Sequence, residues 1–412
     1  MRIPRDFYLQ KLIDRKGNGM VKVITGVRRC GKSYLLFELF RDHLLESGVS
    51  AGHIIGVQLD DRANKALRDP DACDGFVRKR VGADGPYYVL IDEVQLMDEF
   101  EDVLNGFLHI PGLDVYVTGS NSRFLSKDVI TEFRGRGDEV RIHPLSFAEF
   151  FNVYEGDWDD AWNSYLTYGG MPYVALLSHE RDKAEYLQRL FRETYLRDIV
   201  ERNHVRHEAE MHDLASIVAS GIGSLTNPDK LARTFASLKG TTLSAPTIKR
   251  YLDCLEDAFL IGSAKRYDVR GKRYISTPLK YYFEDVGLRN ALLNFRQQEP
   301  THLQENVVYN ELVARGYSVD VGIVDITEAG TRKRTEIDFV ANLGSMRYYV
   351  QSAFALPDEA KRTQELRPFK AVNDSFKKIV VVGGSSAVTR DEQGFVTMGV
   401  KQFLLDEHSL EV

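Results

Sequence analysis

The chain has 412 residues, of which 43% are hydrophobic and 28% are charged, and its formal net charge is −6 at pH 7. This length exceeds one ordinary core and predicts two or three domains, and the composition is typical of a soluble globular protein. The negative net charge argues against a protein that coats nucleic acid along its whole surface.

The sequence contains no run of eighteen apolar residues, and its start, MRIPRDFYLQ, carries charges where a signal peptide needs an apolar stretch. We therefore expect no membrane segment and a cytoplasmic location. The cysteines Cys30, Cys73 and Cys254 lie far apart and form no CxxC pair. This spacing argues against a disulfide framework and against a structural zinc site.

Residues 25–33, TGVRRCGKS, fit the pattern G-x-x-x-x-G-K-[ST] through Gly26, Gly31, Lys32 and Ser33. In this pattern a glycine-rich loop surrounds phosphate groups with backbone N–H groups. The lysine reaches the β- and γ-phosphates, and the hydroxyl ligates Mg²⁺. The alternative is an ordinary glycine turn with a surface lysine.

The residues on either side favour the phosphate loop. Residues 21–25 alternate like a strand, and residues 33–47 carry apolar side chains at helical spacing. A strand, a glycine turn and a helix aim N–H groups and a helix N-terminus at one point, which suits anionic oxygens. We expect nucleotide binding by Gly26, Val27, Arg28, Arg29, Cys30, Gly31, Lys32, Ser33 and Tyr34.

A second apolar strand, within YYVLIDEVQLM at residues 87–97, is followed by Asp92 and Glu93. An aspartate at the carboxyl end of a strand can hold Mg²⁺, usually through water, and the next glutamate can orient or deprotonate the attacking water. We therefore expect Asp92, with Ser33, to bind the metal and Glu93, with Lys32, to act in catalysis.

A third strand, in LDVYVTGSNS at residues 113–122, leads to Ser120 and Asn121, which could reach the γ-phosphate or the attacking water. The alternative is an ordinary turn. Arg134 and Arg136 follow in a glycine-rich turn. One of them could act as an arginine finger, in its own chain or toward a neighbouring subunit, or both could be solvated loop residues.

Four stretches, ITGVRRCGKSYLL, YYVLIDEVQLM, VYVTGSNSRFLS and GRGDEVRIHPLSFAEF, together resemble a widespread group of prokaryotic AAA+-type ATPases. The resemblance covers most of the chain. It implies an ATPase core that uses ATP and Mg²⁺, and leaves the biological role of the group open. The implied roles are nucleotide contacts for Lys32, Ser33, Asp92 and Glu93, a sensor position near Ser120 and Asn121, and a Gly-Arg turn at Arg136.

The middle of the chain is helical and aromatic from residue 158 to residue 203, and we expect its aromatic side chains to form core. The GGMP stretch at residues 169–172 predicts a bend. Residues 213–223, 227–238 and 244–261 then predict three helices, with Asn227 as a cap. Residues 263–277 predict two strands around a tight turn, so the order is that of a winged helix-turn-helix.

A local excess of positive charge falls on the predicted winged helix. Residues 229–280 contain eleven Lys and Arg against five Asp and Glu. Such side chains could contact DNA phosphates with salt-sensitive, mostly sequence-independent affinity. The candidates are Lys249, Arg250, Arg266, Arg270, Lys272 and Arg273. The alternative is structural, because winged helices also pack against neighbouring domains or bind proteins.

The C-terminal part resembles the restriction-endonuclease-like fold, in which a helix glutamate, a strand aspartate and an E-x-K motif collect Mg²⁺ around a phosphate. Glu305 or Glu311 and Asp338 match the first two elements, but Gln351 and Ala353 stand at the positions of the motif's acid and lysine. We therefore expect no cleavage activity, because a hard cation loses a charged ligand and the site loses its cation.

The sequence thus predicts an α/β fold class in four parts. These are a P-loop ATPase domain with a parallel sheet at residues 1–150, a helical lid or connector at 151–207, a winged helix-turn-helix at 208–290 and a nuclease-like α/β domain at 291–412. We expect an ATP-hydrolysing switch whose C-terminal parts act on a macromolecular partner, with double-stranded DNA as one candidate. The alternatives are a nucleotide-gated ATPase that acts on a protein or another copy of itself, and, less favoured, an ATP-dependent nuclease.

Overall fold

The computed structural model describes residues 2–119, 135–205, 207–240, 242–328 and 331–412. The chain forms two compact units. The first comprises residues 1–144 with 257–259, and the second comprises residues 145–256 with 260–412. Within the described ranges, no helix is both long and apolar enough to cross a lipid bilayer.

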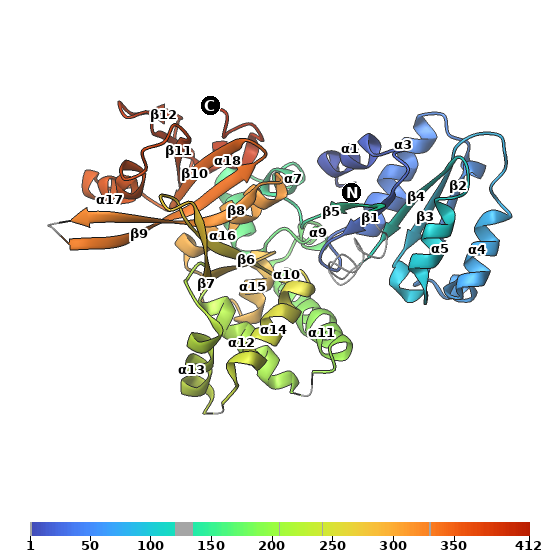
Figure 1. Cartoon of the computed structure of the whole chain (residues 1–412), viewed down its shortest axis with the longest axis horizontal. Helices are drawn as coiled ribbons and strands as arrows, with labels where there is room; N and C mark the ends of the chain where they lie inside the picture. Colours follow the sequence, from blue (N-terminus) through green and yellow to red (C-terminus); the bar gives the residue numbers. More distant parts are fainter. Residues whose placement is uncertain (1, 120–134, 206, 241, 329–330) are drawn as a thin grey trace. The chain divides into compact units, whose positions relative to one another are not determined.

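A five-stranded parallel sheet forms the centre of the first unit (Figure 1). Its order is β2 (Ile54–Gln58), β3 (Tyr87–Asp92), β4 (Leu113–Thr118), β1 (Val21–Thr25) and β5 (Gly137–Arg141), with every neighbouring pair parallel. The strands β1 and β3 are buried along their whole length, which explains their nearly continuous apolar sequences. Parallel pairing places the carboxyl ends of all five strands at one edge.

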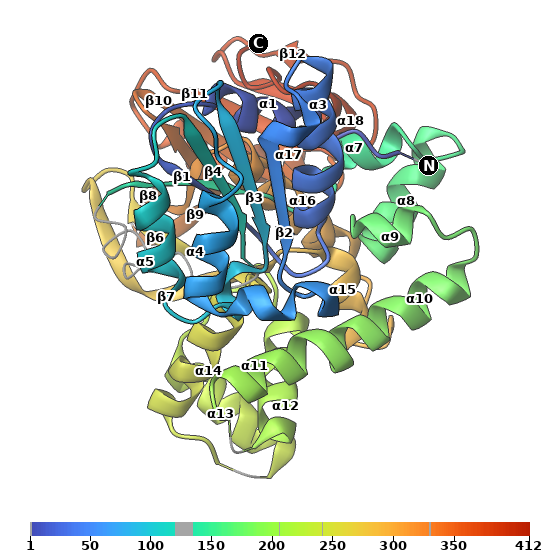
Figure 2. The same ribbon diagram turned by 90° about the vertical axis from the view of Figure 1, so that its right-hand side faces the viewer.

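Helices connect β1 to β2, β2 to β3 and β3 to β4, and Figure 2 shows several of them beside the sheet. Cys73 and Val77 of α4 and Leu104 and Phe107 of α5 pack in one apolar cluster with the strands. The helix that follows β1 runs from Lys32 to Glu46 with a π-helical middle. The elements are α1 (Asp6–Asp14), α2 (Lys32–Tyr34), η1 (Leu35–Phe40), α3 (Arg41–Glu46), η2 (Ala51–His53), η3 (Arg62–Arg68), α4 (Pro70–Arg78), η4 (Val94–Leu96) and α5 (Phe100–Phe107).

The second unit begins with helices whose aromatic side chains form core, as the sequence predicts. The Phe147 ring contacts those of Trp158 and Trp162 at centroid distances of 4.8 and 5.4 Å. The predicted bend occurs where α8 ends before Gly169 and α9 begins at Pro172. The helices are α7 (Phe147–Phe151), α8 (Trp158–Tyr168), α9 (Pro172–Ala175), α10 (Glu180–Arg189), η6 (Leu190–Leu196) and α11 (Arg197–Arg202).

Three helices and a hairpin follow in the predicted order: α12 (Glu208–Ser220), α13 (Pro228–Lys239), α14 (Ala245–Asp257), β6 (Ile261–Asp268) and β7 (Arg273–Phe283). Asn227 caps α13, since its side chain accepts a hydrogen bond from the Lys230 N–H at 2.7 Å. The Asp268 carboxylate closes the hairpin turn by accepting from the Gly271 N–H at 2.8 Å. The element order is confirmed, and the winged-helix assignment stays a prediction.

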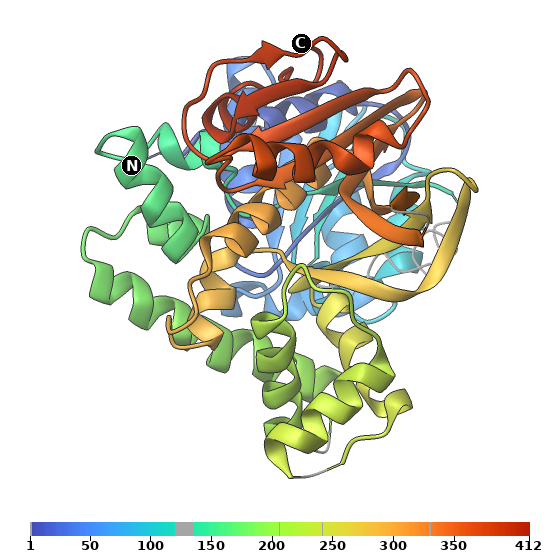
Figure 3. The same cartoon turned by 90° about the vertical axis from the view of Figure 1, so that its left-hand side faces the viewer.

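The hairpin is part of an eight-stranded sheet with the order β12-β13-β11-β10-β9-β8-β6-β7. Figure 3 shows its long C-terminal strands in orange and red. Strand β6 pairs in parallel with β8 through Arg266 and Val321, so the structure joins the hairpin to the strands beyond residue 290. The remaining elements are α15 (Val286–Leu292), α16 (Pro300–Ala314), β8 (Ser318–Glu328), β9 (Thr331–Leu343), β10 (Met346–Ala353), α17 (Glu359–Lys370), β11 (Lys377–Val382), β12 (Thr389–Arg390), β13 (Val396–Gly399) and α18 (Val400–Leu405).

Candidate functional site

The loop between β1 and α2 has the backbone conformation of a tight glycine turn. Gly26 and Gly31 have φ angles of 138° and 101°, and Arg29 has a φ of 64°. A Cβ atom on Gly26 would lie 2.1 Å from the Ile142 carbonyl oxygen, so only glycine fits there. The observed backbone is therefore the tight glycine turn that the sequence pattern predicts.

The ammonium group of Lys32 lies across this loop. It donates to the carbonyl oxygens of Gly26 at 2.9 Å and Val27 at 3.1 Å, and the residue is 4% exposed. These contacts hold the positive charge against the backbone of the loop.

A buried carboxylate faces the first turn of α2. Asp92, the last residue of β3, is 2% exposed and accepts a hydrogen bond from the Ser33 hydroxyl at 3.0 Å. It also accepts from the Thr118 hydroxyl. Burial raises the pKa of Asp92, and the two hydroxyls oppose that rise because they stabilise its ionised form.

Thr118 is a site residue that the sequence analysis did not identify. It ends β4, which pairs with β1 on one side and β3 on the other, so its hydroxyl reaches both Asp92 and the residue after it. The Glu93 N–H donates to the Thr118 hydroxyl at 2.9 Å. The sequence does carry a signal for Thr118, because it is a hydroxyl residue at the end of a predicted strand, two residues before Ser120.

Glu93 occupies a left-handed backbone conformation, with a φ of 52° and a ψ of 48°. This conformation is uncommon for a residue with a side chain and often marks functional positions. The Gln95 amide donates to the Glu93 carboxylate, which is half-buried. Glu93 is thus held at the same strand edge as Asp92 by its backbone and its side chain.

The donor set fits Mg²⁺ bound together with a nucleotide. Magnesium prefers oxygen ligands and usually takes one or two from the protein and the rest from phosphates and water. Ser33 and Asp92 supply two such oxygens at 3.0 Å from one another. The described residues contain no group of three or more His, Cys, Asp or Glu that could hold a metal ion alone.

The other predicted nucleotide-site residues differ in their exposure, and some lie outside the described ranges. Arg28 and Arg29 are exposed, Tyr34 is half-buried, and Arg136 is exposed before β5. Ser120, Asn121 and Arg134 lie outside the described residues.

Comparison with known proteins identifies the relationship of the whole chain. The chain is 35% identical over 387 residues to an uncharacterized protein of Haemophilus influenzae. The aligned residues make up 92% of this chain and 93% of that protein. The chain belongs to that protein's family. A AAA domain family matches residues 18–151, and a domain family of unknown function matches residues 159–299. Residues 18–151 of this chain are therefore a domain of the P-loop AAA+ type, as the sequence predicts.

Two proteins of lower sequence identity also resemble this chain. The uncharacterized protein MJ1544 of Methanocaldococcus jannaschii is 28% identical over 419 residues, covering 98% of this chain and 89% of that protein. The Walker-type ATPase PABY2304 of Pyrococcus abyssi is similar in structure with a TM-score of 0.48 and 16% identity, over 71% of this chain and 96% of that one.

The basic side chains proposed for DNA contact differ in availability. Lys249 forms an ion pair with Asp253 at 2.9 Å, and Arg273 forms one with Asp268 at 3.4 Å. Arg266 is only 7% exposed, so its guanidinium does not lie at the surface as the sequence suggested. The remaining candidates, Arg250, Arg270 and Lys272, are exposed, and Arg270 donates to the Asp325 carbonyl oxygen at 3.1 Å.

The nuclease-like residues gather around a lysine that the sequence analysis did not identify. Lys280 of β7 lies with its Nζ 3.1 Å from Glu305, 3.5 Å from Glu336 and 3.9 Å from Asp338. Burial alone would lower its pKa, but these carboxylates together raise it. Burial and the charge of Glu305 raise the pKa of Asp338. A cation is thus present, although Ala353 replaces the lysine of the sequence motif.

Neighbouring hydrogen bonds complete this cluster. The Tyr282 hydroxyl donates to Glu305 at 2.7 Å, and the Ser352 N–H donates to Asp338 at 2.9 Å. The Gln351 side-chain oxygen accepts from the Asp338 N–H at 3.3 Å. Of the two glutamates considered for this site, Glu305 is in the cluster and Glu311 pairs with Arg315 at 2.8 Å.

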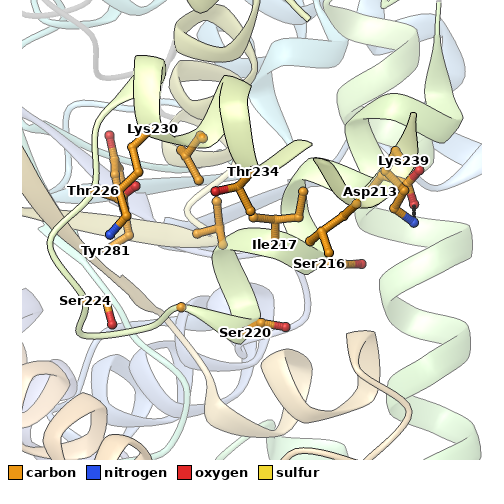
Figure 4. Close-up of a pocket in the computed structure, with 14 residues that line it drawn as sticks. Asp213, Ser216, Ile217, Ser220, Ser224, Thr226, Lys230, Thr234, Lys239 and Tyr281 are labelled. Atoms are coloured by element: carbon orange, nitrogen blue, oxygen red, sulfur yellow. Dashed lines mark ion pairs between the residues drawn. The ribbon is translucent and has the colours of Figure 1, made fainter. Parts of the chain in front are cut away.

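A pocket of about 410 Å³ lies between α12 and α13 (Figure 4). Its charged side chains already have partners within the protein: Lys239 pairs with Asp213 at 2.7 Å, and Lys230 donates to the Leu225 carbonyl at 2.8 Å. The rest of its lining is mainly aliphatic groups and hydroxyls, including Ser216 and Thr234. We assign the pocket to the packing of these two helices, because its acid, Asp213, is already paired with Lys239.

Proposed function

We propose that the chain binds ATP with Mg²⁺ at the loop between β1 and α2, hydrolyses it, and works as a nucleotide-dependent switch. The observation that carries this proposal is the meeting of Ser33, Asp92 and Thr118 at one strand edge, beside Lys32 and Glu93. These residues come from three separate segments of the chain, residues 32–33, 92–93 and 118, and ordinary packing gives no reason for their polar groups to converge. A nucleotide site requires this combination of cation, metal ligands and carboxylate.

Each residue has a definite role in this proposal. Lys32 neutralises the β- and γ-phosphates, and Ser33 and Asp92 hold the metal that lowers the charge of the phosphates. Glu93 orients or deprotonates the attacking water, and Gln95 positions its carboxylate. The roles of Asn121 as a sensor and of Arg136 as an arginine finger remain predictions from the sequence.

The second unit is proposed to convey the nucleotide state to a macromolecular partner. Double-stranded DNA fits the exposed basic residues Arg250, Arg270 and Lys272. A protein partner, or a second copy of the chain, is the alternative. The ion pairs of Lys249 and Arg273 and the burial of Arg266 favour this alternative, since they leave fewer cations free for phosphates.

Steady-state ATP hydrolysis by wild type and Glu93→Gln, each with and without duplex DNA at low and moderate salt, tests the proposal. We expect wild type to turn over ATP and Glu93→Gln to lose at least about 100-fold in kcat while it still binds ATP. Lys32→Ala should bind ATP poorly. Hydrolysis that survives unchanged in both variants would reject the site assignment.

The DNA arm separates the two partner classes. Stimulation that decreases with salt and is lost on replacing Arg270 and Lys272 by Glu indicates DNA. Hydrolysis that depends on Glu93 and ignores DNA at every salt concentration indicates a protein partner.

A further inference from the structure

One buried arginine near the N-terminus connects the phosphate loop to the chain segment that leaves the first unit. Arg5 is 3% exposed, and its guanidinium lies 4.7 Å from the centroid of the Tyr8 ring. Its Nη1 donates to the Cys30 carbonyl oxygen at 3.0 Å, and its Nη2 donates to the His143 carbonyl oxygen at 2.7 Å. A single side chain therefore joins Cys30, 25 positions along the chain, to His143, 138 positions along the chain.

The first of these bonds orients a peptide group of the loop. A trans peptide is planar, and its C=O and N–H point in opposite directions. Holding the Cys30 oxygen toward Arg5 turns the Gly31 N–H the other way, and Gly31 is the residue before Lys32. Gly31 has a φ of 101°, a backbone conformation that glycine adopts readily, so this peptide can take the orientation that the Arg5 hydrogen bond favours.

The second bond attaches the loop to residues 142–144. Gly26 packs against the Ile142 carbonyl so closely that a Cβ atom would be 2.1 Å from it. The Ile142 N–H donates to the Thr25 carbonyl at 2.8 Å, and the Cys30 sulfur lies 3.8 Å from the Ile142 oxygen. Pro144, two residues after Ile142, is the last residue of the segment 1–144 of the first unit.

We propose that Arg5 is a positioning residue for the nucleotide site: through the Cys30 peptide it aims the Gly31 N–H at the phosphates, and through His143 it transmits the state of the loop to the segment that joins the units. This inference rests on the proposed ATP site. It assigns to the N-terminal segment a part in nucleotide binding and in communication between the units.

Arg5→Ala and Arg5→Lys in the full chain test the inference, with Arg2→Ala as a matched control. Arg2 lies on the same segment but makes an exposed ion pair with Asp42 at 3.1 Å. We expect Arg5→Ala to weaken binding of a fluorescent ATP analogue roughly 10- to 100-fold, because two charge-assisted hydrogen bonds are lost. Arg5→Lys keeps the charge but not the fork, so its loss should be smaller. Arg2→Ala should bind like wild type.

A second measurement separates positioning from simple stability. Hydrogen exchange of residues 139–146, followed with and without saturating ADP, should slow on nucleotide binding in wild type. In Arg5→Lys the nucleotide should slow this segment much less, even when the site is saturated and the melting temperature is close to that of wild type. Normal affinity and normal protection in Arg5→Lys would overturn the proposal, and this result would hold even if Arg5→Ala failed to fold.

Failure of the proposed function gives a different result. In that case wild type itself would not bind the ATP analogue, and Lys32→Ala would give the same result as wild type. If wild type binds, Lys32→Ala does not, and both Arg5 variants behave like wild type, then only the role of Arg5 is rejected.

Discussion

Replacing Thr118 by valine tests how the strand edge organises the carboxylates of the nucleotide site. Valine keeps nearly the same shape, so the buried space stays filled. The variant loses the hydrogen bond to Asp92 and the acceptor for the Glu93 N–H, which is 2.9 Å from the hydroxyl. A hydrogen bond to a charged group contributes about 1.5–3 kcal/mol and a neutral one about 1 kcal/mol.

We expect Thr118→Val to lower kcat for ATP hydrolysis roughly 30- to 150-fold, which corresponds to a loss of about 2–3 kcal/mol at the transition state. Measurement of kcat and KM across a Mg²⁺ series checks this, and Thr118→Ser should recover most of the activity because it restores the hydroxyl. A folded Thr118→Val protein with a kcat within about twofold of wild type would refute the reasoning.

The same variant should shift the pH dependence of the reaction. Burial already raises the pKa of Asp92, and the Thr118 hydroxyl opposes that rise. Without the hydroxyl the pKa rises further, and a protonated carboxyl no longer binds Mg²⁺. We expect the activity of Thr118→Val to fall at a higher pH than that of wild type as the medium becomes more acidic. Identical acid limbs in the two proteins would contradict this role.

Two further predictions concern the second unit. Lys280→Met should lower the free energy of unfolding by roughly 3–5 kcal/mol in denaturant titrations, because it leaves Glu305 and Asp338 without their cation, and adding Glu305→Gln should recover part of the loss. A loss below about 1 kcal/mol would argue against this counter-charge role. Burial raises the pKa of Asp285 to about 6, so the folded chain holds the extra proton. The contribution of Asp285 to the free energy of unfolding should therefore fall by about 2–4 kcal/mol as the pH rises from about 4 to 7. The difference in stability between wild type and Asp285→Asn should change with pH by this amount, and a difference that stays constant would contradict the assignment.

Much of the first unit could be predicted because its signals are local. The strand, glycine turn and helix around Gly26 and Lys32 follow from neighbouring residues, and Asp92 and Glu93 stand directly after an apolar run. The helices α12, α13 and α14 and the hairpin turn at Asp268 were likewise legible, because caps and turns depend on residues only a few positions apart.

The sequence analysis missed contacts between residues that lie far apart in the chain. The structure brings Lys280 to Glu305 and Asp338, and this cation could not be found by looking for a lysine two residues after Gln351. It also buries Arg266 where β6 pairs with β8, although its position in a basic segment indicated a surface.

The sequence by itself thus determined the phosphate loop, the acids that follow β3 and the order of the elements, since each depends on short-range backbone preference and apolar spacing. Only the tertiary structure decided that Thr118 joins Asp92 to Glu93, that Lys280 enters the acidic cluster, and that Arg5 holds the Cys30 and His143 carbonyls. These contacts arise from which strands become neighbours and how segments pack. Such pairing is a property of the whole folded chain, which no local pattern records.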